Sequence, residues 1–392
     1  MELFVNFFSV SVVSAFFSWI LLPKILQICM KKALFDSHDE RKIHSGVVPR
    51  LGGVAFFPAL LFPFLVILSI NLLLQTSLVV SVNITLYIEL MLALSAMLLI
   101  YFTGVGDDLM NIRYRIKLMI QIMTGILFTS SGVWINNFYG LFGLNEINAV
   151  IGIPLTIFVI VFIINSINFI DGVDGLAAGI GMFAFLYYGL IFLYMQSYIY
   201  SLLAFSSFGV LIPFFYYNVF GKANRGTKIF MGDSGSLTIG MLLSVFAVKV
   251  CHYNPGSLFQ SSQSIVLAFS ILLVPMFDAL RVILLRICTG KSPFKPDKRH
   301  LHHQFLQLGF SHRGIMLMIL TIAAFFGTGS MLLAPYVDIN LLLGLIILLW
   351  TSMDIFLRIR IKHAVQSIPA KSKKTMKQAY RAGISKSVDE WV

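Results

Sequence analysis

Apolar residues run through this chain in long stretches, each of which is long enough to cross a bilayer. A membrane-spanning helix needs about 20 predominantly apolar residues. The pattern predicts eleven such helices, although only Gln196 and Ser197 separate the sixth from the seventh. They are expected at 3–23, 51–72, 84–104, 118–134, 151–167, 176–196, 198–216, 235–251, 264–286, 314–334 and 338–357. The sequence therefore predicts an all-α polytopic membrane protein.

The composition supports this interpretation and excludes an ordinary soluble domain. Hydrophobic residues make up 58% of the 392 positions and charged residues only 12%, whereas soluble domains carry about 25% charged residues. The net charge of +12 is concentrated in a few segments, so no nucleic-acid partner is expected. The three cysteines are far apart in or near apolar stretches, which predicts neither a disulfide framework nor a zinc site.

The distribution of basic residues predicts the orientation of the chain. If the N-terminus lies outside, every Lys and Arg except Lys249 falls in a segment on the inside, as the positive-inside rule requires. The first apolar run lacks a basic start and a cleavage site, so we expect a retained helix. Residues 1–357 would form the integral membrane domain, and residues 358–392 a basic tail on the inside.

Four clusters of polar residues interrupt the apolar pattern, and all four fall on the predicted inner side. They occupy 106–108, 165–175, 231–236 and 296–303. Carboxylates beside apolar spans are energetically costly and tend to mark function. Several carboxylates at one face suggest a divalent metal ion and a phosphate-bearing substrate.

The first cluster places Asp107 and Asp108 at the end of the third predicted span. Adjacent carboxylates cannot share one helix face, so one could hold a cation while the other faces a substrate. Lys117 follows and supplies a point charge suited to phosphate. A polar stop at the membrane interface is the alternative, although acidic residues are an odd choice on the positive side.

The second cluster repeats a polar residue at every third position, namely Asn165, Asn168, Asp171 and Asp174. On an α-helix this spacing places all four roughly on one half-face, and the glycines within the run also permit a break. Amide and carboxylate oxygens are ligands for hard cations. The two aspartates could divide metal binding and proton handling between them; a polar helix cap and turn is the alternative.

The third cluster, 231–236, is a Gly- and Ser-rich turn that opens a predicted helix. Such a turn offers backbone N–H groups to an anion, and Asp233 within it is either a helix cap or a metal ligand. The basic segment 41–53, which ends in two glycines, could bind an anion in the same way, but its signal is weak when taken alone.

The fourth cluster lies in a basic loop. Its candidate substrate-binding residues are Arg299, His300, His302 and His303. Because lysines surround the imidazoles and no cysteine is near, the loop fits a diphosphate, a nucleotide or a sugar better than a metal ion; a solvated basic loop is the other alternative. Upstream, Asp278 and Arg281 are expected to pair on one helix face as structural support.

These segments resemble the polyprenyl-phosphate N-acetylhexosamine-1-phosphate transferases of glycosyltransferase family 4. The matching segments are VPRLGG (48–53), GDDL and the later lysine (106–117), NFIDGVDGLAAG (168–179), FMGDSGSL (230–237) and PDKRHLHH (296–303). They occur in the family's order over residues 41 to about 310. Within the family, the chain is similar to the branch that starts O-antigen, enterobacterial common antigen and wall teichoic acid.

The resemblance implies a multi-pass enzyme of the bacterial plasma (inner) membrane, with a periplasmic N-terminus, a cytoplasmic C-terminus and cytoplasmic active-site loops. It would transfer N-acetylhexosamine 1-phosphate, with GlcNAc as the favoured sugar, from a UDP-sugar to undecaprenyl phosphate and release UMP. The implied cofactor is Mg²⁺, with Mn²⁺ as an alternative. A homodimer is left open.

The resemblance also assigns roles to individual residues. The catalytic positions are Asp107, Asp108, Asp171 and Asp174. The substrate-binding positions are Lys117, Arg299, His300, His302 and His303. The metal ligands would be Asn168, Asp233 and Asp108.

Two departures from the family pattern bear on the alternatives. Leu301 interrupts the three consecutive histidines of the sister branch that makes the murein lipid precursor, which argues against that activity. Residues 219–229 look longer than in that branch, so Asn218 is not carried over as a ligand. A CDP-alcohol phosphotransferase would need an arginine after Asp174-Gly175, and a secondary transporter would place ionisable residues at mid-membrane.

Overall fold

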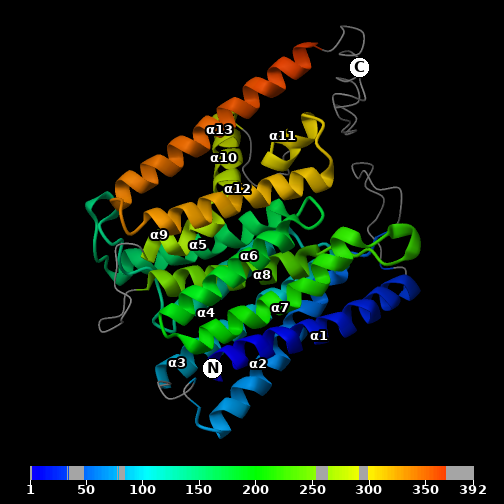
Figure 1. Cartoon of the computed structure of the whole chain (residues 1–392), viewed down its shortest axis with the longest axis vertical. Coiled ribbons are helices and arrows are strands. Elements are labelled where there is room, and N and C mark those ends of the chain that lie inside the picture. The colour runs from blue at the N-terminus through cyan, green and yellow to red at the C-terminus, as the bar shows by residue number, and fades with distance from the viewer. Residues whose placement is uncertain are drawn as a thin grey trace.

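The computed structural model describes residues 2–32, 34, 48–76, 78, 84–252, 264–290 and 299–367. Within these ranges the chain is a bundle of long helices that run roughly alongside one another, and no strand forms (Figure 1). The helices are α1 (Glu2–Lys32), η1 (Leu51–Ala55), α2 (Phe56–Leu73), α3 (Ile84–Met110), α4 (Tyr114–Thr129), η2 (Leu141–Gly143), α5 (Ala149–Ile170), α6 (Leu176–Tyr194), α7 (Tyr198–Phe220), η3 (Ala223–Arg225), α8 (Gly232–Cys251), α9 (Ser264–Phe269), η4 (Ser270–Leu272), α10 (Leu273–Cys288), α11 (Leu301–Gln307), α12 (His312–Leu333) and α13 (Ile339–Ser367).

The helices confirm a polytopic all-α protein but shorten one predicted span. In the part of the chain that is described, ten helical segments are long and apolar enough to cross a membrane. The exception is the span predicted at 118–134, where α4 has only 16 residues. At 1.5 Å per residue such a helix is about 24 Å long, less than the ~30 Å hydrocarbon core. The predicted boundary between the sixth and seventh spans is confirmed, because α6 ends at Tyr194 and α7 begins at Tyr198.

The centre of the bundle is α8, which α3, α5 and α6 contact. In its most apolar window 94% of the residues are buried, compared with 28% for α1 at the edge. Small residues let neighbouring backbones approach α8 closely, as is usual between membrane helices. At Gly240, for example, a Cβ atom would lie 2.8 Å from the Cα atom of Ile164 in α5. The helix that carries Asp233 is therefore the most firmly enclosed element of the fold.

The last helix, α13, lies at the edge of the bundle opposite α1 (Figure 1). It continues to Ser367, past residue 357, where the sequence predicts the membrane domain to end. The rest of the predicted tail, 368–392, lies outside the described residues. The division into a membrane domain and a basic tail stays a prediction.

Candidate active site

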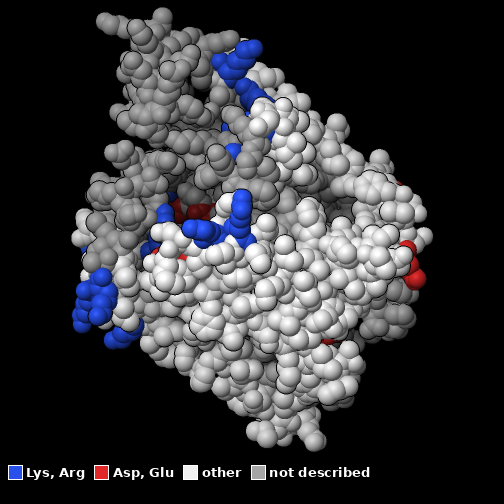
Figure 2. Space-filling model, turned by 180° about the vertical axis from the view of Figure 1, so that it is seen from behind, with Lys and Arg blue, Asp and Glu red and all other residues white. Residues whose placement is uncertain are grey.

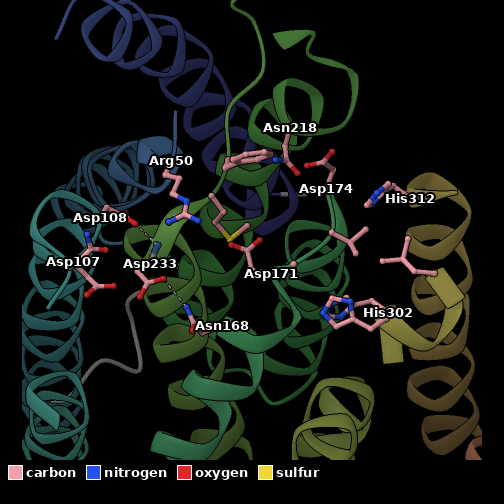
Figure 3. Close-up of a pocket in the computed structure, with 18 residues that line it drawn as sticks. Arg50, Asp107, Asp108, Asn168, Asp171, Asp174, Asn218, Asp233, His302 and His312 are labelled. Carbon is pink, nitrogen blue, oxygen red and sulfur yellow. Dashed lines mark hydrogen bonds between the residues drawn. The ribbon is translucent and has the colours of Figure 1, made fainter. Parts of the chain in front are cut away.

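The separate polar clusters meet in one cavity of about 340 Å³. It lies where α3 ends, where α5 turns into α6 and where α8 begins, with α11 and α12 closing the opposite side (Figure 3). The polar and charged side chains in its lining are Arg50, Asp107, Asp108, Asn111, Asn168, Asp171, Asp174, Asn218, Asp233, His302, His303 and His312. Asp108 and Asp233, which are 125 positions apart, are joined directly by a hydrogen bond. The predicted convergence of the acidic motifs is therefore present.

The first turn of α8 is held by Asp108 from the end of α3. One oxygen of the Asp108 carboxylate accepts from the backbone N–H of Asp233 at 2.8 Å, and the other accepts from that of Ser234 at 2.9 Å. The first N–H groups of a helix have no partner within the helix and carry a partial positive charge. Asp108 therefore satisfies and anchors the start of α8, and both its oxygens are already engaged.

Lys117, near the start of α4, links two carboxylates of the cavity. Its Nζ lies 2.9 Å from Oδ2 of Asp107 and 2.8 Å from Oδ2 of Asp233. The other oxygen of Asp233 accepts from the amide of Asn168 at 3.1 Å, and that amide also donates to Ser236. These contacts place Asp107, Asp233 and Asn168 around one point on the wall of the cavity.

The sequence predicts that four polar residues share one face of a helix, and this prediction is wrong for Asp171 and Asp174. α5 ends at Ile170 and α6 begins at Leu176, so Asp171 and Asp174 lie in the intervening turn. Gly175 makes the turn possible because its φ is +76°, a value that other residues rarely adopt. Asn165 does not line the cavity; its amide donates to Gln121 in α4 at 2.7 Å.

The two aspartates of the turn have different surroundings. Asp174 forms an ion pair with Lys228, with its oxygen 2.5 Å from Nζ. The carboxyl group of Asp171 faces the middle of the cavity (Figure 3). Burial raises the pKa of Asp171 well above its usual range, and the nearby carboxylates of Asp233 and Asp108 add to this rise. Asp171 therefore has the environment expected of a group that takes up a proton.

The histidine motif divides into two parts. His302 and His303 line the cavity, and burial lowers the pKa of His302 to about 3, so its ring is neutral at ordinary pH. His300 does not line the cavity: its Nδ1 lies 2.9 Å from Oδ2 of Asp278. Arg299 is also absent from the lining. The substrate-binding roles of these four residues stay predictions, and the structure places only His302 and His303 where a ligand would touch them.

The predicted pair of Asp278 and Arg281 is confirmed and has a wider role. Nη2 of Arg281 lies 2.7 Å from Oδ1 of Asp278, and its Nη1 lies 2.8 Å from Asp354 in α13. Asp278 also accepts from the backbone N–H of Leu301, the first residue of α11. The pair therefore fixes the position of the histidine motif. The lysines of the same loop, at 291, 295 and 298, lie outside the described residues.

Arg50 is the functional candidate that sequence reasoning did not single out. Its side chain extends towards the cavity between Asp108 and Asp233 (Figure 3). It is placed by backbone pairing, because Gly52 N–H donates to Phe230 O at 3.0 Å and Gly53 N–H donates to Met231 O at 2.9 Å. The VPRLGG motif was a signal for this residue, but nothing in the sequence showed that the motif pairs with the start of α8.

A glycine is required where these two segments meet. A Cβ atom on Gly53 would lie only 1.9 Å from the backbone nitrogen of Gly235, so any larger residue would force the segments apart. His312 and Asn111 also line the cavity, and no sequence motif marked either of them.

The charges of the cavity favour a cation-binding site. Five aspartates line it, and the basic side chains placed among them are Arg50, Lys117 and Lys228. Within the described ranges, no group of three or more His, Cys, Asp or Glu residues already has the geometry of a metal site. Two carboxylate oxygens nevertheless converge on a single cationic group, the ammonium of Lys117, and carboxylate and amide oxygens are the ligands that Mg²⁺ prefers. The donor set therefore fits a hard divalent cation.

Basic side chains lie beside the mouth of the site. Figure 2 shows acidic atoms inside a hollow, with Lys and Arg side chains around it at the same end of the bundle. An acidic interior with a basic surround would attract an anionic substrate and accept its counter-cation.

Comparison with known proteins shows which sequences the chain is similar to. The sequence model of glycosyl transferase family 4 matches residues 90–251. A Yersinia pestis protein named undecaprenyl-phosphate alpha-N-acetylglucosaminyl 1-phosphate transferase is 28% identical over 79% of both chains. Over residues 90–251, the chain is therefore similar to glycosyl transferase family 4.

Two further relatives of this chain have similar names. A Bacillus subtilis protein named a probable undecaprenyl-phosphate N-acetylglucosaminyl 1-phosphate transferase is 29% identical over 80% of this chain and 81% of its own length. An Escherichia coli K12 protein, with the same name as the Yersinia one, is 27% identical over 76% of both chains.

The range matched by the family model contains three of the five motifs, those with Asp107, Asp171 and Asp233. VPRLGG and PDKRHLHH lie outside that range. The structure nevertheless brings Arg50 and His302 to the same cavity as the three matched motifs.

Proposed function

We propose that this protein transfers N-acetylglucosamine 1-phosphate from UDP-GlcNAc to undecaprenyl phosphate and releases UMP. The observation that carries the proposal is the acidic cavity at the ends of membrane helices, built from the motifs of a family 4 enzyme. The relatives' names, which specify undecaprenyl phosphate and an N-acetylglucosaminyl 1-phosphate group, support this substrate pair. The product would initiate a cell-envelope polysaccharide.

The reaction exchanges one phosphoanhydride bond for another. An oxygen of the lipid phosphate attacks the β-phosphorus of the UDP-sugar, the bond from the β-phosphorus to the bridging oxygen breaks, and that oxygen leaves with UMP. Positioning and charge neutralisation supply most of the catalysis in such transfers. A membrane-bound acceptor and a water-soluble donor can meet only near the bilayer surface, and the cavity lies at the ends of the spans.

Mg²⁺, or Mn²⁺ in its place, is the proposed cofactor, with Asp233, Asp107 and Asn168 as its ligands. This set replaces Asp108 with Asp107, because both oxygens of Asp108 hold the start of α8. When bound, the cation would neutralise charge on the diphosphate and on the departing UMP.

The remaining residues have proposed roles that follow from their positions. Asp171 would take the proton of the lipid phosphate, since its carboxyl group faces the middle of the cavity and burial raises its pKa. Arg50 would hold a phosphate group through its planar guanidinium. His302 and His303, on the far side of the cavity from Asp108, would contact the nucleotide or sugar. Asp174 is assigned to holding Lys228.

The proposed location is the bacterial plasma membrane, with the cavity and C-terminus on the cytoplasmic side. The support is the distribution of basic residues: every Lys and Arg except Lys249 falls in a segment predicted to lie inside. Lys249 lies at the other end of α8 from Asp233. A secondary transporter is less well supported, because the acidic cluster lies at helix ends and not at mid-membrane.

The decisive experiment is a transfer assay with the purified full-length protein. Undecaprenyl phosphate is incubated with Mg²⁺ and each of a panel of UDP-sugars labelled in the sugar, including UDP-GalNAc and UDP-MurNAc-pentapeptide. The proposal expects a labelled lipid diphosphate from UDP-GlcNAc and an equal amount of UMP. Release of UDP instead of UMP, or no lipid product with any sugar, would refute it.

A further inference from the structure

The ammonium of Lys117 lies at the point where the proposed cation would bind. Its distances to Oδ2 of Asp107 and Oδ2 of Asp233 are 2.9 Å and 2.8 Å. Both partners are on helices other than α4, so Lys117 is the group that joins the ends of three elements. The contact is partly open to the cavity, because the Lys117 side chain is 24% exposed and that of Asp233 is 26% exposed.

A divalent cation and this ammonium cannot occupy the same position. The two carboxylates proposed to hold the ion are the ones that Lys117 contacts, and two positive charges at such short range repel each other strongly. One of them must leave when the other binds. The lysine is the one that can move, because its side chain is a flexible four-carbon stem that ends in a single charge.

Asp233 keeps its position without the lysine. Its other oxygen accepts from Asn168, and its own backbone N–H is held by Asp108. Neither contact involves Lys117. Removing the lysine therefore leaves this carboxylate in place but with one less positive charge beside it.

We propose that Lys117 and the divalent cation compete for Asp107 and Asp233, so that cation binding releases Lys117 into the cavity. The proposal rests on the proposed function for the identity of the cation. Once displaced, the ammonium remains close to Asp233 and is available to an anionic phosphate of the incoming donor. Lys117 then neutralises Asp107 and Asp233 in the metal-free protein and contacts the substrate in the protein that holds the cation.

The proposed competition and a purely structural role of Lys117 predict opposite changes in cation affinity when the lysine is removed. If Lys117 competes with the cation, removing its charge tightens cation binding. If Lys117 only holds the two aspartates together, its removal loosens the site and weakens cation binding.

The test is a titration of the full-length protein in detergent with Mn²⁺, in the absence of substrate, followed by electron paramagnetic resonance of the free ion. Lys117→Gln keeps a polar group that can bond to both aspartates, and Lys117→Met removes it. Lys228→Met is the matched control, because it deletes the same charge from another aspartate of the cavity. The expected result is Mn²⁺ binding about tenfold tighter in both Lys117 variants and within about threefold of wild type in the control.

Two outcomes would overturn the competition. In one, the Lys117 variants bind Mn²⁺ no more tightly than wild type, or no protein binds it at all. In the other, Lys228→Met tightens binding as much as Lys117→Met, which would show a general effect of charge. The transfer assay separates this question from the proposed function: a protein that gains Mn²⁺ affinity in the variants but transfers no sugar phosphate would retain the competition and lose the reaction.

Discussion

The two ends of the α3–α8 pair contain the same kinds of side chain and use them differently. At the cavity end, Lys117 bridges Asp107 and Asp233. At the other end, Lys249 of α8 forms an ion pair with Glu89 of α3, with Nζ 2.5 Å from Oε2, and the hydroxyl of Tyr200 donates to the same oxygen at 3.2 Å. Both ends thus join the helices through a lysine and a carboxylate.

The difference lies in the balance of charge. At the Glu89 end one carboxylate meets one ammonium, and the ring of Tyr200 lies 5.1 Å from the same Nζ. At the cavity end, five aspartates exceed the basic side chains placed among them. A balanced, enclosed pair serves to fix helix register, whereas a surplus of carboxylates around a cavity must be offset by a further cation or by bound protons. The comparison shows that charge excess, more than the presence of charge, marks the functional end.

The largest expected effect comes from removing one of these carboxylates, that of Asp233. Asp233→Asn should lower the transfer rate at least ~1000-fold, because an amide is a much weaker partner for a divalent cation and for Lys117. Protein yield and melting temperature should stay close to wild type. The comparison would fail if this variant retained near-wild-type turnover.

Asp108 should show a smaller loss of a different kind. Asp108→Asn replaces one of the two oxygens that hold the first turn of α8 with an N–H donor. We expect a drop of roughly 100-fold in transfer together with a loss of about 1–2 kcal/mol in stability. Measuring turnover and thermal unfolding on the same samples checks both. Loss of activity with unchanged stability would instead point to direct contact with the cation.

The Glu89 end should affect stability and spare the reaction. Glu89→Gln leaves Lys249 enclosed without its countercharge and should cost about 3–5 kcal/mol. Adding Lys249→Met should recover most of that loss. Turnover of the folded double variant should stay within about threefold of wild type. If the double variant folds well but transfers poorly, this end also takes part in the reaction.

The smallest effect is a dependence of stability on pH through His302. Its pKa is lowered to about 3 in the folded protein, whereas a free histidine has a pKa of about 6.5. The unfolded chain therefore binds the proton first, and the stability contribution present above pH 6.5 is lost as the pH falls towards 3.

The check is the melting temperature of wild type and His302→Asn between pH 7 and pH 5. His302→Asn should show a shallower decline than wild type, and His303→Asn serves as the control. Identical slopes for wild type and His302→Asn would contradict this assignment. Asp171 acts in the opposite direction, since a raised pKa favours the folded state at lower pH, and it is present in all three proteins.

The spans and the meeting of the motifs could be predicted because they depend on simple properties. Apolar length fixes where helices cross the membrane, and basic residues mark which ends lie together. Asp107, Asp171 and Asp233 could be grouped because each follows or opens a predicted span on the same side. The largest difference for a whole span is at α4, whose first turn begins before the apolar stretch and which stops at Thr129.

The roles within the cavity could not be predicted because they depend on the orientation of side chains. Adjacent aspartates look equivalent in the sequence, yet Asp108 caps α8 and Asp107 faces Lys117. Asn165 and Asn168 have the same spacing as their neighbours, but only Asn168 reaches Asp233. Such differences arise from the rotation of each helix about its axis, which packing against other helices decides.

The contact of Gly53 with Gly235 has a consequence for how the protein is made. The ribosome synthesises the VPRLGG segment long before α8, so the early helices enter the bilayer without the element that completes their edge. Gly52 and Gly53 can donate to Phe230 and Met231 only after the residues that precede α8 have been made. Release of the nascent chain before α8 would therefore leave the site without Asp233.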